Sequence, residues 1–432
     1  MKRKSLAFIG WRFIFGRRGH HVPDDLARKA VRGAILSVAI SLVPLLIVMQ
    51  VSDGMIEGIT ARYIELSTYH LQVRSYSPAS LDENLRQSIL ATPAVTGAWF
   101  EQRSAGVVFH QGHQEGVSIR ALQPAFLADE ATRQYMNLLA GELSLDKPVD
   151  ALIGSALAEN LEVGPGDAIN LITMRTNQAG ALFPRVSIFI IKGVVSAGYR
   201  EIDAHWLLIP YQSAGRVMEA DSSEKIIGVK IADPYTGSAQ ARERLHTRLA
   251  GSAQVHAWPE IERNLFASLA NTRSILLLIM AITVIVAAVN VTSALSTLAM
   301  ERSREIAILK CLGAKNIDIA MIFSLSGAFL GALGALLGCV AGILCGMQVN
   351  GLIYGIERVI NASRRLFAGQ AEAGAIRLLE PAYYLEKIPV GFDFRNIVTI
   401  VLLTIIVSFL AALFPARKAA KLIPLEVMRK HG

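Results

Sequence analysis

Two groups of side chains have types and spacing that could support chemistry. His110 and His113 could bind a metal ion together, but no third ligand and no helix that would align them accompany the pair. Glu201, Asp203 and His205 alternate along the chain, and polar residues at a strand edge explain them most simply. The serines and aspartates elsewhere follow no nucleophile motif. The sequence therefore predicts no catalytic site and no metal site.

The chain also lacks the phosphate-binding loop of ATPases. No G-x-x-x-x-G-K-[ST] segment occurs, so any energy from ATP must come from another subunit, which would carry the ATP and Mg²⁺. We expect no cofactor bound by this chain. Four apolar stretches contain no Asp, Glu, Lys or Arg: Gly33–Val51, Ser274–Met300, Ile319–Ile356 and Asn396–Ala416. Because ion-coupled carriers and channels usually place ionisable groups at the membrane midplane, this argues against a self-sufficient ion-coupled transporter.

Each of these stretches approaches or exceeds the roughly 20 residues that a helix needs to cross a bilayer. We therefore predict an α-helical membrane protein with four transmembrane helices, at 33–51, 273–300, 319–350 and 396–416. A large α/β domain would be inserted between helices 1 and 2. The third stretch is too long for one straight span, so its end should bend or continue outside the membrane. Six glycines repeat along it at intervals of three or four residues, which predicts close helix packing: Gly327, Gly331, Gly334, Gly338, Gly342 and Gly346.

The distribution of charge predicts the orientation in the membrane. The net charge is +8, and Lys and Arg gather in the leader 1–32, in the segment 301–316 and in the tail 417–432. The positive-inside rule makes these parts cytoplasmic, and it places the 52–272 domain and the 351–395 loop outside. Within the leader, 5–15 resembles a helix lying on the membrane surface. The basic residues thus indicate topology and lipid headgroups, and we expect no nucleic acid.

The segment 52–272 has the pattern of a soluble α/β domain between two helical stalks, at 52–68 and 260–272. Strand patterns at 70–77, 95–109, 225–231 and 254–258 accompany helical patterns at 81–90 and 239–249. The middle is rich in strands, at 168–174, 186–195 and 205–209. All three cysteines lie in or beside the membrane segments, so the domain needs no disulfide.

The most specific local feature is Glu301–Lys315, directly after the second span. Its charges come first, Ile306, Leu309 and Leu312 then recur at helical spacing, and Gly313 can end the helix. A short amphipathic helix between two spans suits docking on a soluble partner, and a plain interfacial connector is the alternative. The residues predicted to dock are Glu301, Arg302, Arg304, Glu305, Ile308, Leu309 and Gly313.

This segment resembles the loop after the second span in MacB/FtsX-type permeases of ABC transporters. Leu413–Met428 resembles their closing P-A-R-x-A-A signature. Within that superfamily the chain looks most like the lipoprotein-releasing permeases of the LolC/LolE family. The similarity includes Val51–Met55, Val163–Asp167, Gly193–Tyr199 and Leu379–Tyr384, and it spans nearly the whole chain.

The resemblance implies a non-catalytic permease subunit of the bacterial inner membrane that extracts lipoproteins by mechanotransmission. Its partners would be a LolD-like ABC ATPase, a second permease in a homo- or heterodimer, and a LolA-like periplasmic chaperone. Glu301–Gly313 would be the coupling helix. The chaperone-binding hook would fall on 175–185, with Ala181, Leu182, Phe183, Pro184 and Arg185 near its tip. We place a lipoprotein cavity between spans one and two, with the following lining: Ile40, Val43, Leu46, Ile47, Met49, Ile279, Ile282 and Val286.

Three alternatives remain open on the sequence. A MacB-like exporter of peptides or small molecules would share the architecture, although this chain has no fused ATPase. An FtsX-like transmembrane regulator would share it too. A membrane-anchored enzyme would need a cluster of catalytic residues in the 70–260 region, and none is visible. The sequence does not distinguish a LolC-like half, a LolE-like half and a homodimer.

Overall fold

The computed structural model describes residues 25–75, 81–176, 182–219, 223–249, 252–368, 390–391 and 394–421. The described residues divide into two compact units, an α/β domain from Ile56 to Leu269 and a helical bundle formed by the rest. Two long helices, α2 (Asp25–Arg62) and α11 (Arg263–Glu301), contribute residues to both units. The predicted surface helix of the leader lies outside the described residues.

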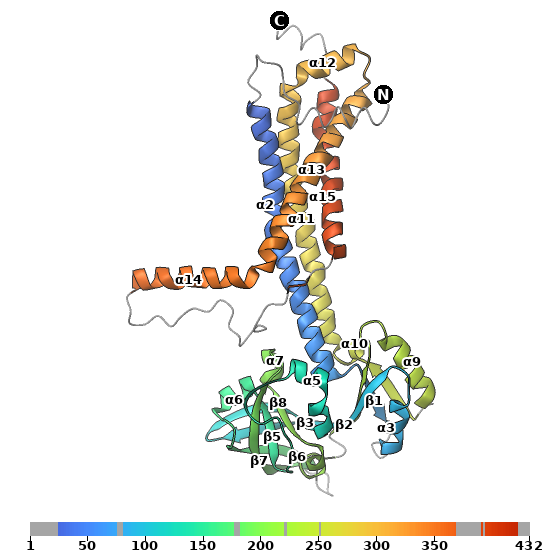
Figure 1. The fold of residues 1–432 in the computed structure, drawn as a ribbon, viewed down its shortest axis with the longest axis vertical. Coiled ribbons are helices and arrows are strands. Elements are labelled where there is room, and N and C mark those ends of the chain that lie inside the picture. The colour runs from blue at the N-terminus through green and yellow to red at the C-terminus, as the bar shows by residue number, and fades with distance from the viewer. Residues whose placement is uncertain are drawn as a thin grey trace. The chain divides into compact units, whose positions relative to one another are not determined.

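The bundle consists of α2 and α11 together with α13 (Asn316–Met347) and α15 (Phe394–Ala420) (Figure 1). Each of these four helices is long and apolar enough to cross a membrane. Their packed faces form one core, in which Leu42 of α2, Leu295 of α11, Leu330 of α13 and Ile400 of α15 are fully buried. The charge-free stretches thus correspond to packed helices of sufficient length to span a bilayer.

The glycines of α13 allow its neighbours to approach closely. A Cβ at Gly327 or Gly331 would lie 2.4 Å from an atom of α15, which is closer than real side chains pack. A Cβ at Gly334, Gly338 or Gly342 would lie 2.7 to 3.0 Å from α2. The predicted close packing is therefore present and has two partners: the first two glycines face α15, and the later ones face α2.

Two shorter helices complete the bundle unit. Helix α12 (Ser303–Cys311) connects α11 to α13, and α14 (Val349–Ala368) follows α13 after Gln348. The predicted bend at the end of the third apolar stretch is thus at Gln348. The segment 351–395 was predicted to be a loop, yet its first part is helical. The charge-free stretch continues from α13 into the first part of α14, so charge-free length alone does not separate the two helices.

The α/β domain is built on one ten-stranded sheet, in the order β10-β1-β9-β2-β3-β8-β5-β7-β4, with β6 pairing with β2 and β7. Most neighbouring strands are antiparallel, whereas β3–β8 and β5–β7 are parallel. The strands are β1 (Leu71–Ser75), β2 (Val95–His110), β3 (His113–Leu122), β4 (Asn137–Gly141), β5 (Asp150–Gly154), β6 (Ala168–Thr176), β7 (Leu182–Ser196), β8 (Trp206–Pro210), β9 (Glu224–Ile231) and β10 (Ala253–Ala257). Each strand pattern in the sequence corresponds to a strand of the structure, whereas β3, β4 and β5 match no predicted pattern.

Helices cover the sheet and complete three hydrophobic clusters in the domain. The π-helix η1 (Tyr63–Thr68) continues directly from α2, and its Leu66 is fully buried in the same cluster as Trp206 and Leu208. The remaining helices are α3 (Glu83–Leu90), α4 (Pro124–Ala128), α5 (Glu130–Tyr135), α6 (Ser155–Leu161), α7 (Arg200–Asp203), η3 (Tyr211–Ser213), α8 (Ala214–Val217), α9 (Ser238–Leu249) and α10 (Trp258–Ile261). The end of α2 is therefore part of the core of the domain.

Candidate functional site

Helix α12 lies at the end of the bundle where α11 ends and α13 begins, near the last residues of α15 (Figure 1). Arg302 breaks the helical path between α11 and α12. Gly313 then adopts a positive φ of 93°, a conformation that favours glycine, and its N–H donates to the carbonyl of Lys310. The predicted helix and its glycine stop are both present.

The inner face of α12 is fixed to the bundle. Ile306 is fully buried in the bundle core, and Leu309 packs against it. Arg302 is also buried, and its guanidinium donates to the carboxylate of Glu305 at 2.6 Å. Arg302 therefore faces the bundle and not a soluble partner, whereas Leu309 is half-buried and its predicted contact with a partner stays a prediction.

The outer face of α12, defined by Arg304, Ile308, Cys311 and Leu312, is exposed. Ile308 is 46% exposed and Leu312 is 79% exposed. Two large apolar side chains beside an arginine, held on a rigid connector, are suited to contact with another protein. Leu312 continues the helical spacing of Ile306 and Leu309 in the sequence, but the helix ends at Cys311, so this spacing does not place Leu312 on their face.

A buried ionic cluster holds the end of η1 against the sheet. Glu101 on β2 is fully buried and accepts from the guanidinium groups of Arg120, at 2.6 and 2.9 Å, and of Arg103, at 2.6 Å. Arg120 also donates to the carbonyl of Leu66, and Arg103 to the carbonyl of Ser67. The last carbonyls of the helical segment, which have no partner within a helix, are thus bound by two arginines.

In this cluster the two arginines affect the pKa of Glu101 more than burial does. Burial by itself raises the pKa of the carboxyl group, but the two neighbouring arginines lower it to about 2. Glu101 is therefore charged at neutral pH, and its buried negative charge is paired with the positive charges of the two arginines. Glu101 and Arg103 are two residues apart, but Arg120 and the carbonyls of Leu66 and Ser67 come from other segments of the chain, so no local sequence pattern reveals the cluster.

A second ionic group lies beside the same helical segment. Lys230 on β9 forms an ion pair with Glu65 of η1 at 2.8 Å and donates to Asp129 at 2.7 Å. His70 contacts Glu65 at 2.9 Å through Nε2. Burial raises the pKa of Asp129, but the hydrogen bond and charge of Lys230 and the hydrogen bonds from Thr132 together lower it by more, so the net pKa is lowered. Together the two groups attach the end of the first long helix to three strands of the sheet.

The segment predicted as the hook is mostly a strand hairpin. Strands β6 and β7 remain paired as far as Thr176 and Leu182, so the predicted loop residues from Leu182 to Arg185 belong to β7. Ala181 lies outside the described residues. The expected exposure is nevertheless present, since Leu182 is 66% and Phe183 43% exposed. The described residues of the predicted hook are thus paired strand residues of β6 and β7, and the residues between Thr176 and Leu182 lie outside the described part of the chain.

The residues predicted to line a lipoprotein cavity divide into two groups. Leu46 and Met49 are buried in the bundle core, and Leu46 packs where a Cβ of Gly342 would be, so these two cannot line a cavity on the bundle surface. Val43 and Ile47 are half-buried. The other residues are exposed on the outer surfaces of α2 and α11: Ile40, Ile279, Ile282 and Val286.

The residues that first suggested chemistry are accounted for by structural contacts. His110 is exposed at the β2–β3 turn, and its Nδ1 lies 3.0 Å from the carbonyl of Ala168. Asp203 is buried in α7, where it accepts from Ser196 and from the N–H of Ala197; burial raises its pKa. Asp203 therefore lies in a helix, and the prediction that it lies at a strand edge is wrong. Among the described residues, no group of three or more His, Cys, Asp or Glu could hold a metal ion.

Known proteins resemble the chain over almost its whole length. The family model described as "FtsX-like permease C-terminal" matches residues 277–424. The "Lipoprotein-releasing system transmembrane protein LolC" of Xylella fastidiosa is 25% identical over 426 residues, which is 98% of each chain. The protein of the same name from Neisseria meningitidis is 23% identical over 98% of each chain. These matches support an ABC transporter permease of the LolC/LolE type.

Both halves of the family are represented among the relatives of this permease. The "Lipoprotein-releasing system transmembrane protein LolE" of Haemophilus influenzae is 23% identical over 98% of this chain and 99% of its own. A solved structure, the extracellular domain of the noncanonic ABC-type transporter YknZ, aligns over 43% of the permease with a TM-score of 0.30 and 9% identity, which is too weak to bear on the fold. The family and the four apolar helices together make this permease a multi-pass membrane protein.

Proposed function

We propose that this chain is the permease subunit of an ABC transporter that releases lipoproteins from the bacterial inner membrane. The observation that carries the proposal is the match to proteins named LolC and LolE over 98% of this chain. In this proposal the permease pairs with a second permease, which is either a second copy or a related chain. ATP and Mg²⁺ bind to a separate ATPase, and this chain transmits the motion without catalysing a reaction.

The proposed orientation has both termini and α12 in the cytoplasm and the α/β domain in the periplasm. The clustering of Lys and Arg in 1–32, 301–316 and 417–432 supports it. Figure 1 shows the start of α2, the end of α15 and the whole of α12 at one end of the bundle. A chain that crosses the membrane four times requires this arrangement. This orientation exposes the outer face of α12 to a cytoplasmic partner.

The outer face of α12 is the proposed docking site for the ATPase. Closure of the ATPase would push α12, and α11 would carry the motion without a break in the helix from Glu301 to Arg263. The ionic clusters around η1 would carry motion of α2 into the sheet. Rigid helices and buried ion pairs suit this role because they transmit displacement with little deformation.

The end of the β6–β7 hairpin is the proposed contact for a periplasmic chaperone, and the exposed apolar surfaces of α2 and α11 are the proposed contact for acyl chains. Exposed apolar residues on a projecting hairpin are a common sign of a binding partner. Charge-free helix surfaces suit lipid chains and do not suit ions. The acyl-chain site would use Ile40, Ile279, Ile282 and Val286.

The proposed function predicts that loss of this protein retains lipoproteins in the inner membrane. In a strain that depletes the chain, lipoproteins destined for the outer membrane should be found in inner-membrane fractions. They should return to the outer membrane when the wild-type gene is expressed. Normal lipoprotein sorting with a defect in cell-wall cleavage would instead support a regulator of the FtsX type. The C-terminal family match is compatible with such a regulator.

Docking of the ATPase is tested by Ile308→Asp combined with Leu312→Asp. Both side chains are exposed, so the double variant should fold, and placing two carboxylates in an apolar interface should abolish co-purification of the ATPase. The matched control is Leu139→Asp, which makes the same kind of change on β4, where the side chain is 56% exposed. If the double variant retains the ATPase at the wild-type level, α12 is only a connector.

Chaperone capture is tested by Leu182→Ser combined with Phe183→Ser. The two exposed side chains would be lost, but the backbone pairing of β6 and β7 would remain. Capture of the chaperone from a periplasmic extract should fall while co-purification of the ATPase remains unchanged. Tyr235→Ser, at an exposed residue of the same domain, is the control. Unchanged capture by the double variant would assign the hairpin a structural role.

A further inference from the structure

Helix α14 leaves the bundle at the end opposite to α12. Helix α13 ends at Met347, the N–H of Gln348 donates to the carbonyl of Cys345, and the N–H of Leu352 then donates to the carbonyl of Gln348. Figure 1 shows α14 running across the direction of the bundle helices and not along it. A helix of this length, set crosswise at the end of a spanning helix, does not itself cross the membrane.

The two faces of α14 differ in polarity. Its apolar residues recur every three or four positions and occupy about a third of the helix circumference at 100° per residue. They are Val349, Leu352, Ile353, Ile356, Val359 and Ile360. The opposite face carries Asn350, Tyr354, Glu357, Arg358 and Asn361. This separation is typical of a helix that lies at a boundary between an apolar phase and water.

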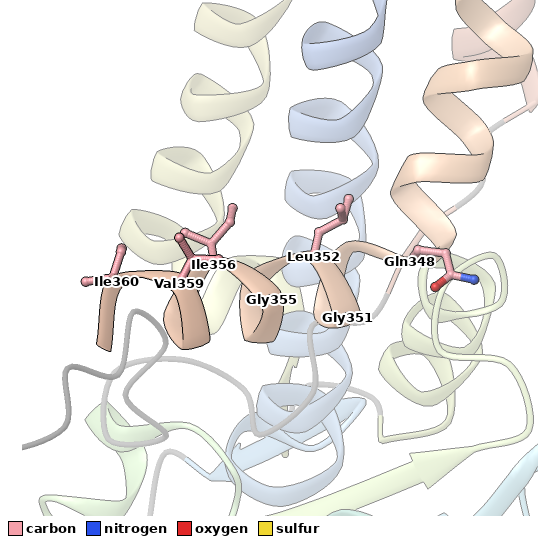
Figure 2. A pocket seen from close by; sticks show the side chains of 7 residues that line it. All are labelled: Gln348, Gly351, Leu352, Gly355, Ile356, Val359 and Ile360. Carbon is pink, nitrogen blue, oxygen red and sulfur yellow. The ribbon is translucent and has the colours of Figure 1, made fainter. Parts of the chain in front are cut away.

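The described part of the chain leaves the apolar face of α14 uncovered. Ile356 is 52% exposed and Val359 is 69% exposed. A groove of about 580 Å³ follows this face and is lined by Gln348, Gly351, Leu352, Gly355, Ile356, Val359 and Ile360. In Figure 2 the side chains of Leu352 and Ile356 point toward the side from which α13 arrives. That side is where the lipid around the bundle would be.

The level of α14 along the bundle is fixed by contacts at its start. Gly346, in the last turn of α13, lies against the side chain of Gln50 on α2. One turn further along α2, Asp53 contacts Arg273 of α11 at 3.5 Å and accepts from Asn396 of α15 at 3.1 Å. Asp53 and Arg273 are the first charges beyond the charge-free stretches at this end of the bundle. Helix α14 therefore begins at the level where the apolar part of the bundle ends.

We propose that α14 is an interfacial helix that lies in the outer leaflet of the membrane, with its apolar face among the acyl chains. The occupant of the groove is bilayer lipid, because the groove opens toward the spanning helices and continues their lipid-facing surface. Tyr354 and Arg358 then reach the headgroups and water, as aromatic and basic side chains do at membrane surfaces. The inference goes beyond the proposed function. It needs only the four spans and the proposed orientation, so it holds whatever substrate the permease takes.

The test places spin labels on both faces of α14 in the full-length protein. Single cysteines at Leu352, Ile356, Tyr354 and Arg358, with the native cysteines replaced by serine, are labelled and reconstituted in nanodiscs of phosphatidylethanolamine and phosphatidylglycerol. Labels at 352 and 356 should collide more with oxygen than with a water-soluble nickel chelate, and labels at 354 and 358 should show the reverse. Water-like collision rates at all four sites would overturn the proposal. Labels at 352 and 356 shielded from both reagents would also overturn it, in favour of a protein partner or second copy on this face.

A substitution pair tests whether the apolar face is the cause of lipid contact. Ile356→Asp places a charge at the centre of the apolar face, and Tyr354→Asp places the same charge on the opposite face. With the label at 352, Ile356→Asp should shift collision toward the nickel chelate, and Tyr354→Asp should leave the oxygen preference intact. Both variants change exposed residues of a short helix outside the bundle core, and equal melting temperatures would verify folding. Equal effects of the two variants would refute the assignment of the faces.

Discussion

Replacement of Glu101 by Gln should weaken the α/β domain where the end of the first long helix is attached. The carboxylate is fully buried between Arg103 and Arg120. Its pKa falls from 4.5 to about 2, a change of about 2.5 pKa units, which corresponds to about 3 kcal/mol of stability at neutral pH. Breaking a buried ion pair typically costs about 3–5 kcal/mol, which agrees in size. A loss of about 3 kcal/mol is a large fraction of the stability of a domain, roughly 5–15 kcal/mol.

The sign of the pH dependence follows from the direction of the pKa change. Because the folded pKa of Glu101 lies below its unfolded value, the stabilisation is complete above about pH 4.5 and is lost as the pH falls toward 2. The wild-type protein should therefore lose stability over this range, and the Gln variant should lose less. The difference between the two proteins should be largest near neutral pH.

The assay is denaturant unfolding of the full-length protein in detergent, followed by tryptophan fluorescence. Trp206 is a local probe, because the guanidinium of Arg120 lies 5.0 Å from its ring centroid. The matched control is Glu83→Gln, which removes an exposed partner of Arg86 and should leave the unfolding midpoint unchanged. A loss below about 1 kcal/mol for Glu101→Gln, measured against this control, would refute the account of the cluster given above.

Three further predictions concern the bundle. Gly334→Val should destabilise the bundle by about 1–3 kcal/mol or more, since its Cβ would lie 2.7 Å from Val38. The control Val340→Leu, on the exposed side of α13, should have little effect. Thermal unfolding in detergent compares the two variants. Asp53→Ala removes the contacts to Arg273 and Asn396, and it should speed amide hydrogen exchange at the start of α15 without affecting α12. An impermeant thiol reagent applied to intact spheroplasts should label a Ser238→Cys variant but not the exposed native Cys311, and labelling of Cys311 before lysis would reverse the proposed orientation.

The secondary structure was largely predictable because it depends on local patterns. Charge-free length identified the four long helices, and strand patterns in the sequence identified seven of the ten strands that the structure describes. The glycine spacing of α13 also predicted close packing, since the absence of a side chain is a property of the residue itself. The short strand β4 carries no burial pattern, as all five residues are exposed, so periodicity could not detect it.

Which face of a short helix is buried was harder to determine. In α12 the spacing of Ile306, Leu309 and Leu312 indicated one apolar face, yet the helix ends before Leu312, and that side chain is exposed. In α2 the sequence could not separate Leu46, which is buried against Gly342, from Ile40, which faces outward. No charge-free stretch contains an ionisable Asp, Glu, Lys or Arg and most of its residues are apolar, so hydrophobicity carries little information about which side faces another helix.

The sequence by itself determined the four spans, the presence of an α/β domain, the orientation expected from basic residues and the family resemblance, because each depends on composition or on short contiguous motifs. Only the tertiary structure brought Glu101, Arg103 and Arg120 together around the carbonyls of Leu66 and Ser67. It alone also set α14 crosswise at the level of Asp53. Contacts between residues far apart in the chain depend on strand order and helix packing, and no local pattern encodes them.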